Sequence, residues 1–212
     1  HISINNSMGS SEAGLVGGKE RPPGSDGMLQ MEPRPDLAVI DDELCIVTAP
    51  GSEGTLACTG YTPIGYYGDP KKSAETFITL SGRLWVLTGD RARIDVDGQY
   101  VILGRGSQCI NSGGEKIYPE EVEEAARRYA AVGDVQVVGV PDERWGQKVA
   151  AVVQVAAGAS FDRTEFDRIC RNHLSGYKVP KVVCLVDQMQ RSPAGKADYT
   201  WAKKLAAAQA GT

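Results

Sequence analysis

Two short segments combine hydroxyl and carboxylate side chains in a way that suits a nucleotide. Ser10 and Ser11 stand next to Glu12. Hydroxyls and backbone amides in such a turn can donate to phosphate oxygens, while the carboxylate can ligate a hard cation that bridges them. Asp90 follows an apolar run and Gly89, so a ligand can approach closely and the carboxylate can accept from both hydroxyls of a ribose. Taken alone, each segment is better explained as a solvated loop or a common turn than as a binding site.

Two further segments place glycine or lysine in loops. The stretch 104–123 contains the adjacent pair Gly113 and Gly114, whose backbone can approach a narrow ligand. Lys196 ends the sequence Arg-Ser-Pro-Ala-Gly-Lys, directly before a helical pattern. A lone loop lysine is usually a solvated charge, so this residue by itself indicates little. The functional interpretation therefore depends on the order of all four segments along the chain.

The elements before residue 106 that must position these side chains are short strands. Apolar or alternating runs separated by Gly, Pro and Asp are typical of strands joined by turns. They predict a small sheet or barrel-like subdomain, with one helical turn at 71–77 and a hairpin turn at Asp97-Gly98. The stretch 14–35 is rich in Gly, Pro and charge, so we expect irregular surface chain there. The expected strands are 37–40, 44–48, 55–59, 84–86, 91–95 and 100–103.

The segments after residue 105 alternate longer helical patterns with apolar strands. The first helical pattern begins with Pro119, carries acidic residues early and ends with Arg127 and Arg128, so it complements the helix dipole at both ends. A second pattern has apolar side chains at helical spacing over 163–174. This mixed order with short connections predicts an α+β fold. The other expected elements are strands at 135–140, 149–155 and 182–186 and a last helix at 199–208.

Composition argues against several classes of protein. The 212 residues carry 23 Lys and Arg against 27 Asp and Glu, a net charge of -4 with no basic stripe, which argues against a nucleic-acid binder. Two histidines and five scattered cysteines form no zinc motif and indicate a reducing compartment. The apolar runs are far shorter than the roughly 20 residues that span a bilayer. We therefore expect a soluble cytoplasmic protein without a transmembrane segment.

The four segments, taken in this order, closely resemble the adenylate-forming superfamily of acyl-CoA synthetases, luciferases and peptide-synthetase adenylation domains. A fifth stretch, directly after Pro63-Ile64, is similar to the one these enzymes carry before their ribose-binding aspartate. The resemblance covers nearly the whole chain, and its hinge motif is most like that of bacterial fatty-acid and sterol-side-chain CoA ligases. The matching stretches are 7–12 (the Tyr-Gly-x-Thr-Glu motif), 65–77, 85–90 (the ribose segment), 104–123 (the interdomain hinge motif) and 192–196 (the C-terminal lysine motif).

The resemblance implies a fold class of α/β and α+β in two parts. The end of a large AMP-binding domain, a small β-rich subdomain, would occupy 1–106, and a complete small, mobile α+β domain would occupy 107–212. Family members use ATP and Mg²⁺ to convert a carboxylic acid to an acyl-adenylate and pyrophosphate. A thiol, usually that of CoA, then displaces AMP. ATP, Mg²⁺, CoA and a carboxylic acid are therefore the expected cofactors and partners.

The resemblance also implies roles for individual residues. Two positions depart from the family pattern: Ser107 stands at the hinge, where Asp or Lys is usual, and Met8 stands where a Tyr commonly stacks on adenine. Thioether packing against the ring is the expected substitute. The implied roles are Mg²⁺ binding for Glu12, contact with ATP or AMP for Met8, Gly9, Ser10, Ser11, Asp90 and Arg105, a pantetheine passage for Ser112, Gly113 and Gly114, and catalysis of adenylation for Lys196 together with Glu12.

One family feature is missing from the sequence. No Ser/Thr/Gly-rich loop ending in Lys, which cradles the ATP phosphates in the family, occurs in these residues, and the sequence begins without Met. We therefore expect a C-terminal portion of an acyl-CoA synthetase that is inactive alone. Two alternatives are a peptide-synthetase adenylation domain and a non-catalytic binding module. The second would not require Glu12, Asp90, Arg105 and Lys196 together.

Overall fold

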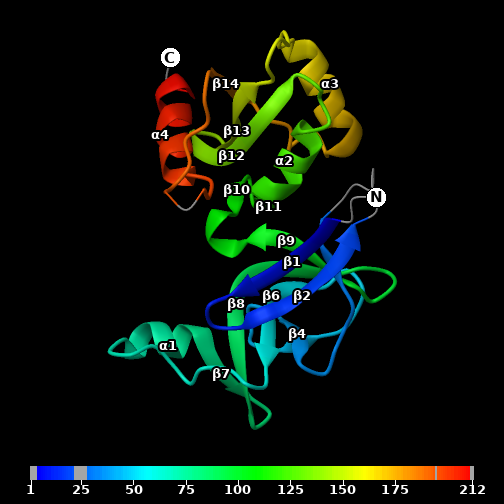
Figure 1. The fold of residues 1–212 in the computed structure, drawn as a ribbon, viewed down its shortest axis with the longest axis vertical. Helices are drawn as coiled ribbons and strands as arrows, with labels where there is room; N and C mark the ends of the chain where they lie inside the picture. Colours follow the sequence, from blue (N-terminus) through cyan, green and yellow to red (C-terminus); the bar gives the residue numbers. More distant parts are fainter. Residues whose placement is uncertain (1–3, 22–27, 194, 211–212) are drawn as a thin grey trace. The chain divides into compact units, whose positions relative to one another are not determined.

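The chain forms two compact units, residues 1–107 and 108–212, which are described separately (Figure 1). The computed structural model describes residues 4–21, 28–193 and 195–210. The boundary lies one residue from the expected position. The identities expected for the two parts, the end of a large domain and a mobile small domain, stay predictions.

The first unit is built on an antiparallel sheet with the strand order β3-β9-β8-β6-β4-β5, on which β7 also pairs with β8. Both faces of β4 are buried, because Val39 packs into one apolar cluster and Ile40 into another on the opposite face. The short helix α1 (Pro70–Thr76) begins at Asp69, whose side chain accepts from the Lys72 amide. The strands are β3 (Gln30–Met31), β4 (Leu37–Ile40), β5 (Ile46–Val47), β6 (Glu53–Thr59), β7 (Phe77–Leu80), β8 (Arg83–Ile94) and β9 (Tyr100–Arg105).

Two expectations for the first unit are wrong. The stretch expected to be irregular contains β2 (Gly14–Arg21), which pairs antiparallel with β1 (Ile4–Ser10), and also β3. Backbone pairing decides this hairpin, and Val16 is buried although its neighbours are mostly glycine and charged residues. The strands expected at 84–86 and 91–95 are one continuous strand, β8, because β8 pairs with β6 on both sides of the irregularity near Gly89.

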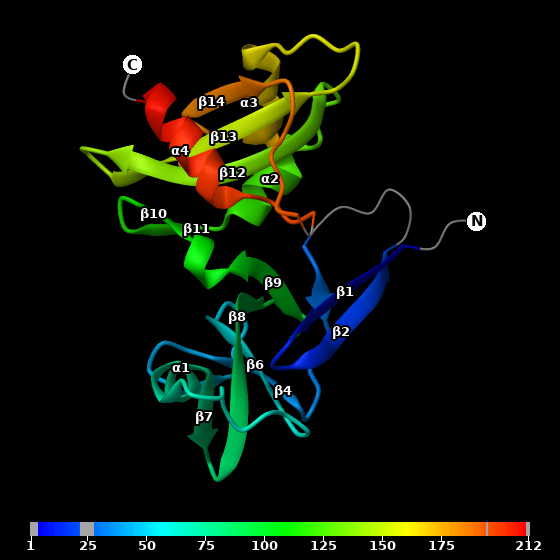
Figure 2. The same cartoon turned by 60° about the vertical axis from the view of Figure 1, so that its left-hand side comes forward.

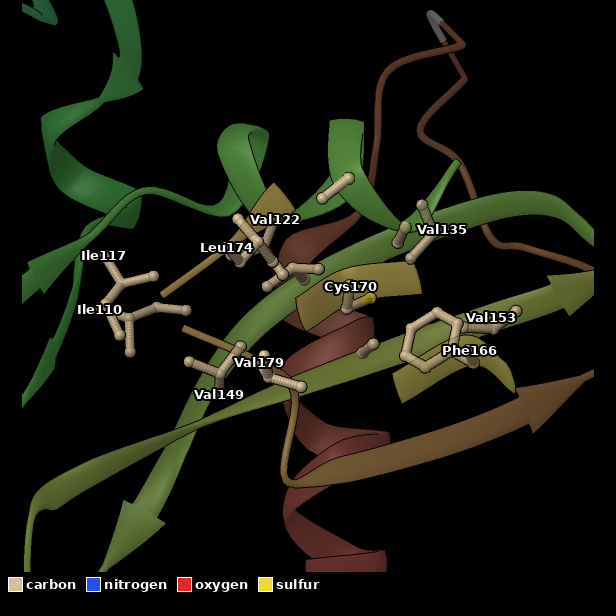
Figure 3. Close-up of a cluster of buried hydrophobic side chains, with 14 residues drawn as sticks. Ile110, Ile117, Val122, Val135, Val149, Val153, Phe166, Cys170, Leu174 and Val179 are labelled. Atoms are coloured by element: carbon tan, nitrogen blue, oxygen red, sulfur yellow. The ribbon is translucent and has the colours of Figure 1, made fainter. Parts of the chain in front are cut away.

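The second unit is a mixed sheet with helices on both faces (Figures 1 and 2). Strands β11, β10, β13 and β12 follow in antiparallel order, and β14 joins β13 in parallel. Helices α2 and α3 cover one face, where Phe166 belongs to a cluster of buried side chains (Figure 3), and α4 covers the other. The elements are β10 (Ile110–Ser112), β11 (Glu115–Ile117), α2 (Pro119–Ala126), β12 (Val132–Asp142), β13 (Gly146–Val155), α3 (Arg163–His173), β14 (Val182–Val186) and α4 (Tyr199–Ala210).

The mixed α and β class and the succession of helices and strands after Pro119 are confirmed. The hairpin of β10 and β11 was not expected. Its two strands, on either side of the glycine pair, have three residues each and are too short to show an alternating pattern. Within the described residues, no helix is both long and apolar enough to cross a membrane.

Candidate active site

Glu12 lies in the tight turn between β1 and β2 and is held by a tyrosine from a distant part of the first unit. The Tyr66 hydroxyl donates to Glu12 Oε1 at 2.6 Å, and this bond is the main reason that the pKa of the carboxyl is lowered. Lys72 Nζ lies 4.1 Å from the centre of the Tyr66 ring, and Phe77 packs edge-on against the ring. Glu12 is therefore an oriented, ionised carboxylate. The sequence assigned no role to Tyr66.

The residues before Glu12 belong to a strand end and not to an open phosphate loop. Met8 is half-buried against the core of the first unit, and the pairing of β1 with β2 shifts between Met8 and Gly9. Ser10 Oγ accepts from the Ala13 amide at 3.0 Å, which closes the turn. Ser11 is exposed. The contacts expected between these residues and a nucleotide stay predictions.

Asp90 and Arg105 face each other across β8 and β9. Their side chains form an ion pair, with 3.0 Å between Arg105 Nε and Asp90 Oδ1. The Asp90 side chain is only 13% exposed, whereas that of Arg105 is 53% exposed. Burial raises the pKa of Asp90, and Arg105 and Thr88 act in the opposite direction. The pair thus combines a largely desolvated acceptor with an accessible donor, a polarity that suits a sugar diol.

Thr88 fixes the backbone that presents this pair. Its buried hydroxyl donates to the Leu56 carbonyl at 2.9 Å and accepts from the Asp90 amide at 3.2 Å. Gly89 lies between the two residues with φ of 79°, a conformation that strains a residue with a side chain. The Thr-Gly-Asp sequence therefore forms a specific irregular bend within β8.

The Gly113-Gly114 pair is the turn of the β10–β11 hairpin. Both residues have positive φ, 61° and 90°, as the tightest hairpin turns require. The Gly113 amide donates to the Trp145 carbonyl at 2.9 Å, and a methyl group on Gly113 would lie 2.6 Å from Trp145 Cε3. Only glycine fits there without a shift of the indole.

A groove of about 430 Å³ lies beside this turn. Its walls combine aromatic rings, from Trp145 and Tyr177, with two lysines. The Arg144 guanidinium also stacks on the Trp145 ring at 4.5 Å. The groove is lined by Ser112, Gly113, Glu115, Trp145, Lys148, Val149, Gly176, Tyr177 and Lys181.

Lys196 is exposed in the connection between β14 and α4. Its backbone makes a reciprocal pair of hydrogen bonds with Ser192, because the Ser192 amide donates to Lys196 O at 2.8 Å and the Lys196 amide donates to Ser192 Oγ at 3.1 Å. Gly195 has φ of 76° and donates to Ser192 O. The lysine therefore stands on a closed turn, although its side chain is solvated.

The predicted site residues are divided between the two units. Glu12, Asp90 and Arg105 belong to the first unit, and the Gly113-Gly114 turn and Lys196 belong to the second. Ser107 lies in a single 3₁₀ turn, Gly106–Gln108, at the junction of the units. The expected hinge residue is thus the last residue of the first unit along the chain, and its motion and the other assigned roles stay predictions.

The carboxylates of the described residues do not form a ready-made metal cage. Among these residues, no group of three or more His, Cys, Asp or Glu side chains is close enough to hold an ion. Glu12 nevertheless fits Mg²⁺, because this ion is often held by one or two carboxylates together with the phosphates of a substrate. The bond from Tyr66 occupies Oε1 and keeps the group ionised.

Comparison with known proteins identifies a family. Residues 121–196 match the model of the AMP-binding enzyme C-terminal domain. The chain is 48% identical over 206 residues to a medium/long-chain fatty acid–CoA/3-oxocholest-4-en-26-oate–CoA ligase of Mycolicibacterium smegmatis, covering 95% of this chain and 37% of that protein. It is 45% identical over 203 residues to the 3-oxocholest-4-en-26-oate–CoA ligase of Rhodococcus rhodochrous, covering 94% of this chain and 37% of that protein.

Solved structures show the same relationship. The amide bond synthetase McbA from Marinactinospora thermotolerans superposes with a TM-score of 0.81 at 27% identity, covering 94% of this chain and 41% of that one. The o-succinylbenzoate CoA synthetase MenE from Bacillus subtilis gives 0.71 at 26%, covering 81% and 34%. The chain thus spans little more than a third of the length of the relatives it matches. Residues 121–196 form an AMP-binding enzyme C-terminal domain, and the chain as a whole is similar in sequence and fold to adenylate-forming enzymes.

Proposed function

We propose that this chain is part of an AMP-forming acid–thiol ligase that acts on a fatty or sterol-side-chain acid. The observation that carries the proposal is the Asp90–Arg105 pair, a largely buried acceptor beside an accessible donor, in a chain whose relatives are named as CoA ligases for such acids. In the first half-reaction, a carboxylate oxygen of the acid attacks the α-phosphorus of ATP and pyrophosphate leaves. In the second, the sulfur of CoA attacks the acyl carbon and AMP leaves.

In the proposed enzyme, the first unit holds the nucleotide. Asp90 accepts from the ribose hydroxyls, and Arg105 donates to the same sugar while it keeps Asp90 ionised in its desolvated position. Glu12 would hold Mg²⁺, which when bound neutralises charge on the phosphates. Tyr66 fixes the direction of Glu12, so the carboxylate need not be ordered when the nucleotide binds.

Lys196 stabilises the transition state of adenylation in this scheme. The attacking carboxylate and the α-phosphate bring negative charge together, and a cation placed there lowers the barrier most if it is already oriented. The closed turn between Ser192 and Lys196 supplies part of that order. Rotation about the Ser107 region would then exchange Lys196 for the Gly113-Gly114 turn between the half-reactions.

The groove beside Gly113 is the proposed CoA surface. A narrow turn without side chains suits pantetheine, and the aromatic rings and lysines of the groove suit an adenine ring and its phosphates. All five cysteines are free thiols, which agrees with a reducing compartment, and we infer that the enzyme works in the cytoplasm, where ATP and CoA are used.

The test separates the two half-reactions in the full-length protein. Lys196→Ala is expected to lower ATP–pyrophosphate exchange about 100-fold or more and to leave acyl-CoA formation from preformed acyl-adenylate nearly unchanged. Lys204→Ala is the matched control. It removes a different exposed lysine, one on α4, and should preserve both rates. Equal loss in both half-reactions would show that Lys196 does not act in adenylation.

The substrate is found with a panel of carboxylic acids. AMP release should require CoA for full turnover and be fastest with fatty or sterol-side-chain acids. Turnover that depends on an amine or on a carrier protein instead of CoA would refute the assignment as an acid–thiol ligase and favour a peptide-synthetase type of adenylation.

A further inference from the structure

Strand β12 carries polar side chains where its neighbours on the same face are apolar. Val138 and Val140 point to the face covered by α4 and pack in its cluster. Gln136 and Asp134 follow on that face at the two-residue spacing of a strand. Gln136 is only 1% exposed. Burial of an amide costs free energy unless the group is hydrogen-bonded, so its partner indicates why it is there.

The partner of each polar side chain belongs to the connection that leads to Lys196. Gln136 Nε2 donates to the Gln190 carbonyl at 3.1 Å. The carboxylate of Asp134 forms an ion pair with the Arg191 guanidinium. Two consecutive residues of the connection are thus tethered to β12, more than 50 residues earlier in the sequence.

Arg191 connects β12 to the turn that bears the lysine. Its second guanidinium nitrogen, Nη1, donates to the carbonyl of Gly195, the residue immediately before Lys196, at 3.3 Å. Arg191 also forms an isolated bridge with Ala197, immediately after Lys196. The Arg191 side chain therefore contacts both the sheet and the turn, and the Arg191 backbone closes the base of the turn.

We propose that Asp134 and Gln136 are positioning residues for Lys196, which act through Arg191 and Gln190. This inference depends on the proposed role of Lys196 in adenylation. Neither residue contacts a reacting group. Both hold the base of the lysine turn on β12, which is paired with β13 along nearly its whole length, so the ammonium group starts from a restricted set of positions. Restricting that set matters because a displacement of about 1 Å can cost about 100-fold in rate.

The test compares two aspartates that are matched in exposure and in having one arginine partner, but that lie in different parts of the second unit. Asp134 and Asp167 each pair with one arginine, and their side chains are 21% and 20% exposed. Only Asp134 is connected to the lysine turn. Asp134→Asn in the full-length protein should lower ATP–pyrophosphate exchange about tenfold with little change in the KM for ATP, and should leave the thioester-forming half-reaction within about twofold. Asp167→Asn should change neither rate.

Two further variants keep the inference falsifiable. Asp134→Glu retains the carboxylate and should recover most of the exchange rate, whereas Gln136→Met, of similar size but without a donor, should resemble Asp134→Asn. Amide hydrogen exchange at Gly195 and Lys196 should accelerate in Asp134→Asn and not in Asp167→Asn. The inference would be overturned if Asp134→Asn lost both half-reactions equally, or if amide hydrogen exchange at Gly195 and Lys196 did not change.

Lys196→Ala, measured in parallel, separates this inference from the proposed function. If Lys196→Ala selectively loses adenylation and Asp134→Asn does not, the positioning role alone is refuted. If Lys196→Ala loses nothing selectively, the assigned role of the lysine fails and the positioning role fails with it.

Discussion

Glu123 gives the second unit a stability that depends on pH near neutrality. It lies on α2 and is buried, although it is charged at high pH. Its Oε1 accepts from the Val137 amide at 2.9 Å and from the Tyr199 hydroxyl at 3.2 Å, and its Oε2 lies 3.3 Å from Arg127 Nη2. Burial, aided by the nearby charge of Glu120, outweighs these contacts and raises the pKa of Glu123 to about 7.

The direction of the effect follows from proton binding. Between the ordinary pKa of 4.5 and about 7, the folded unit holds a proton on Glu123 that the unfolded chain has released. The associated stability is fully present below pH 4.5 and is lost as the pH rises through about 7. A pKa rise of this size corresponds to about 3 kcal/mol, of which about 2.5 kcal/mol falls between roughly pH 5 and pH 8.5.

The assay is urea unfolding of the chain, followed by the NMR signal of the Val137 amide, a residue in the second unit that contacts Glu123. The free energy of unfolding should fall by about 2.5 kcal/mol more in the unmodified chain than in Glu123→Gln across that pH range. Gln keeps the acceptor oxygen for Val137 and Tyr199 but cannot titrate. Carboxyl NMR should show Glu123 titrating near pH 7.

The control is Glu165→Gln. Glu165 is a helical glutamate whose pKa is lowered by its hydrogen bond with Arg168, so it stays ionised throughout this pH range. Its replacement should leave the slope of stability against pH unchanged. If Glu123→Gln and the unmodified chain have the same slope, or if Glu123 titrates below about pH 5, burial does not govern this carboxyl and the argument is wrong.

Tyr66→Phe should keep the ring between Lys72 and Phe77 but remove the donor to Glu12, so the pKa of Glu12 measured by carboxyl NMR should rise; an unchanged pKa would show that the hydroxyl does not control it. Gly113→Ala and Gly114→Ala should each cost about 1 kcal/mol in unfolding because of positive φ. Gly113→Ala should also raise the KM for CoA in the full-length protein more than Gly114→Ala does, because only the methyl group on residue 113 must displace Trp145. An equal effect of both variants on that KM would contradict the proposed groove.

The elements with strong local signals could be predicted from the sequence. Helix α2 begins at Pro119 and carries acids in its first turn, and β4 and β14 are apolar runs that lie where expected. Such signals are contained in a few neighbouring residues. The hairpin of β1 and β2 lacked such signals, because β2 is rich in Gly and charged residues. Its backbone pairing with β1 holds it in a strand.

The sequence also supplied the types of residue that the site requires and their order, because the motifs that contain Glu12, Asp90, Gly113 and Lys196 are continuous in the chain. It could not indicate which partner each side chain finds. Tyr66 is 54 residues from Glu12, Tyr199 is 76 residues from Glu123, and Gln136 and Gln190 are separated by 54. These contacts form only when strands and helices pack, so burial and distance, and with them the charge and direction of each group, were decided by the tertiary structure.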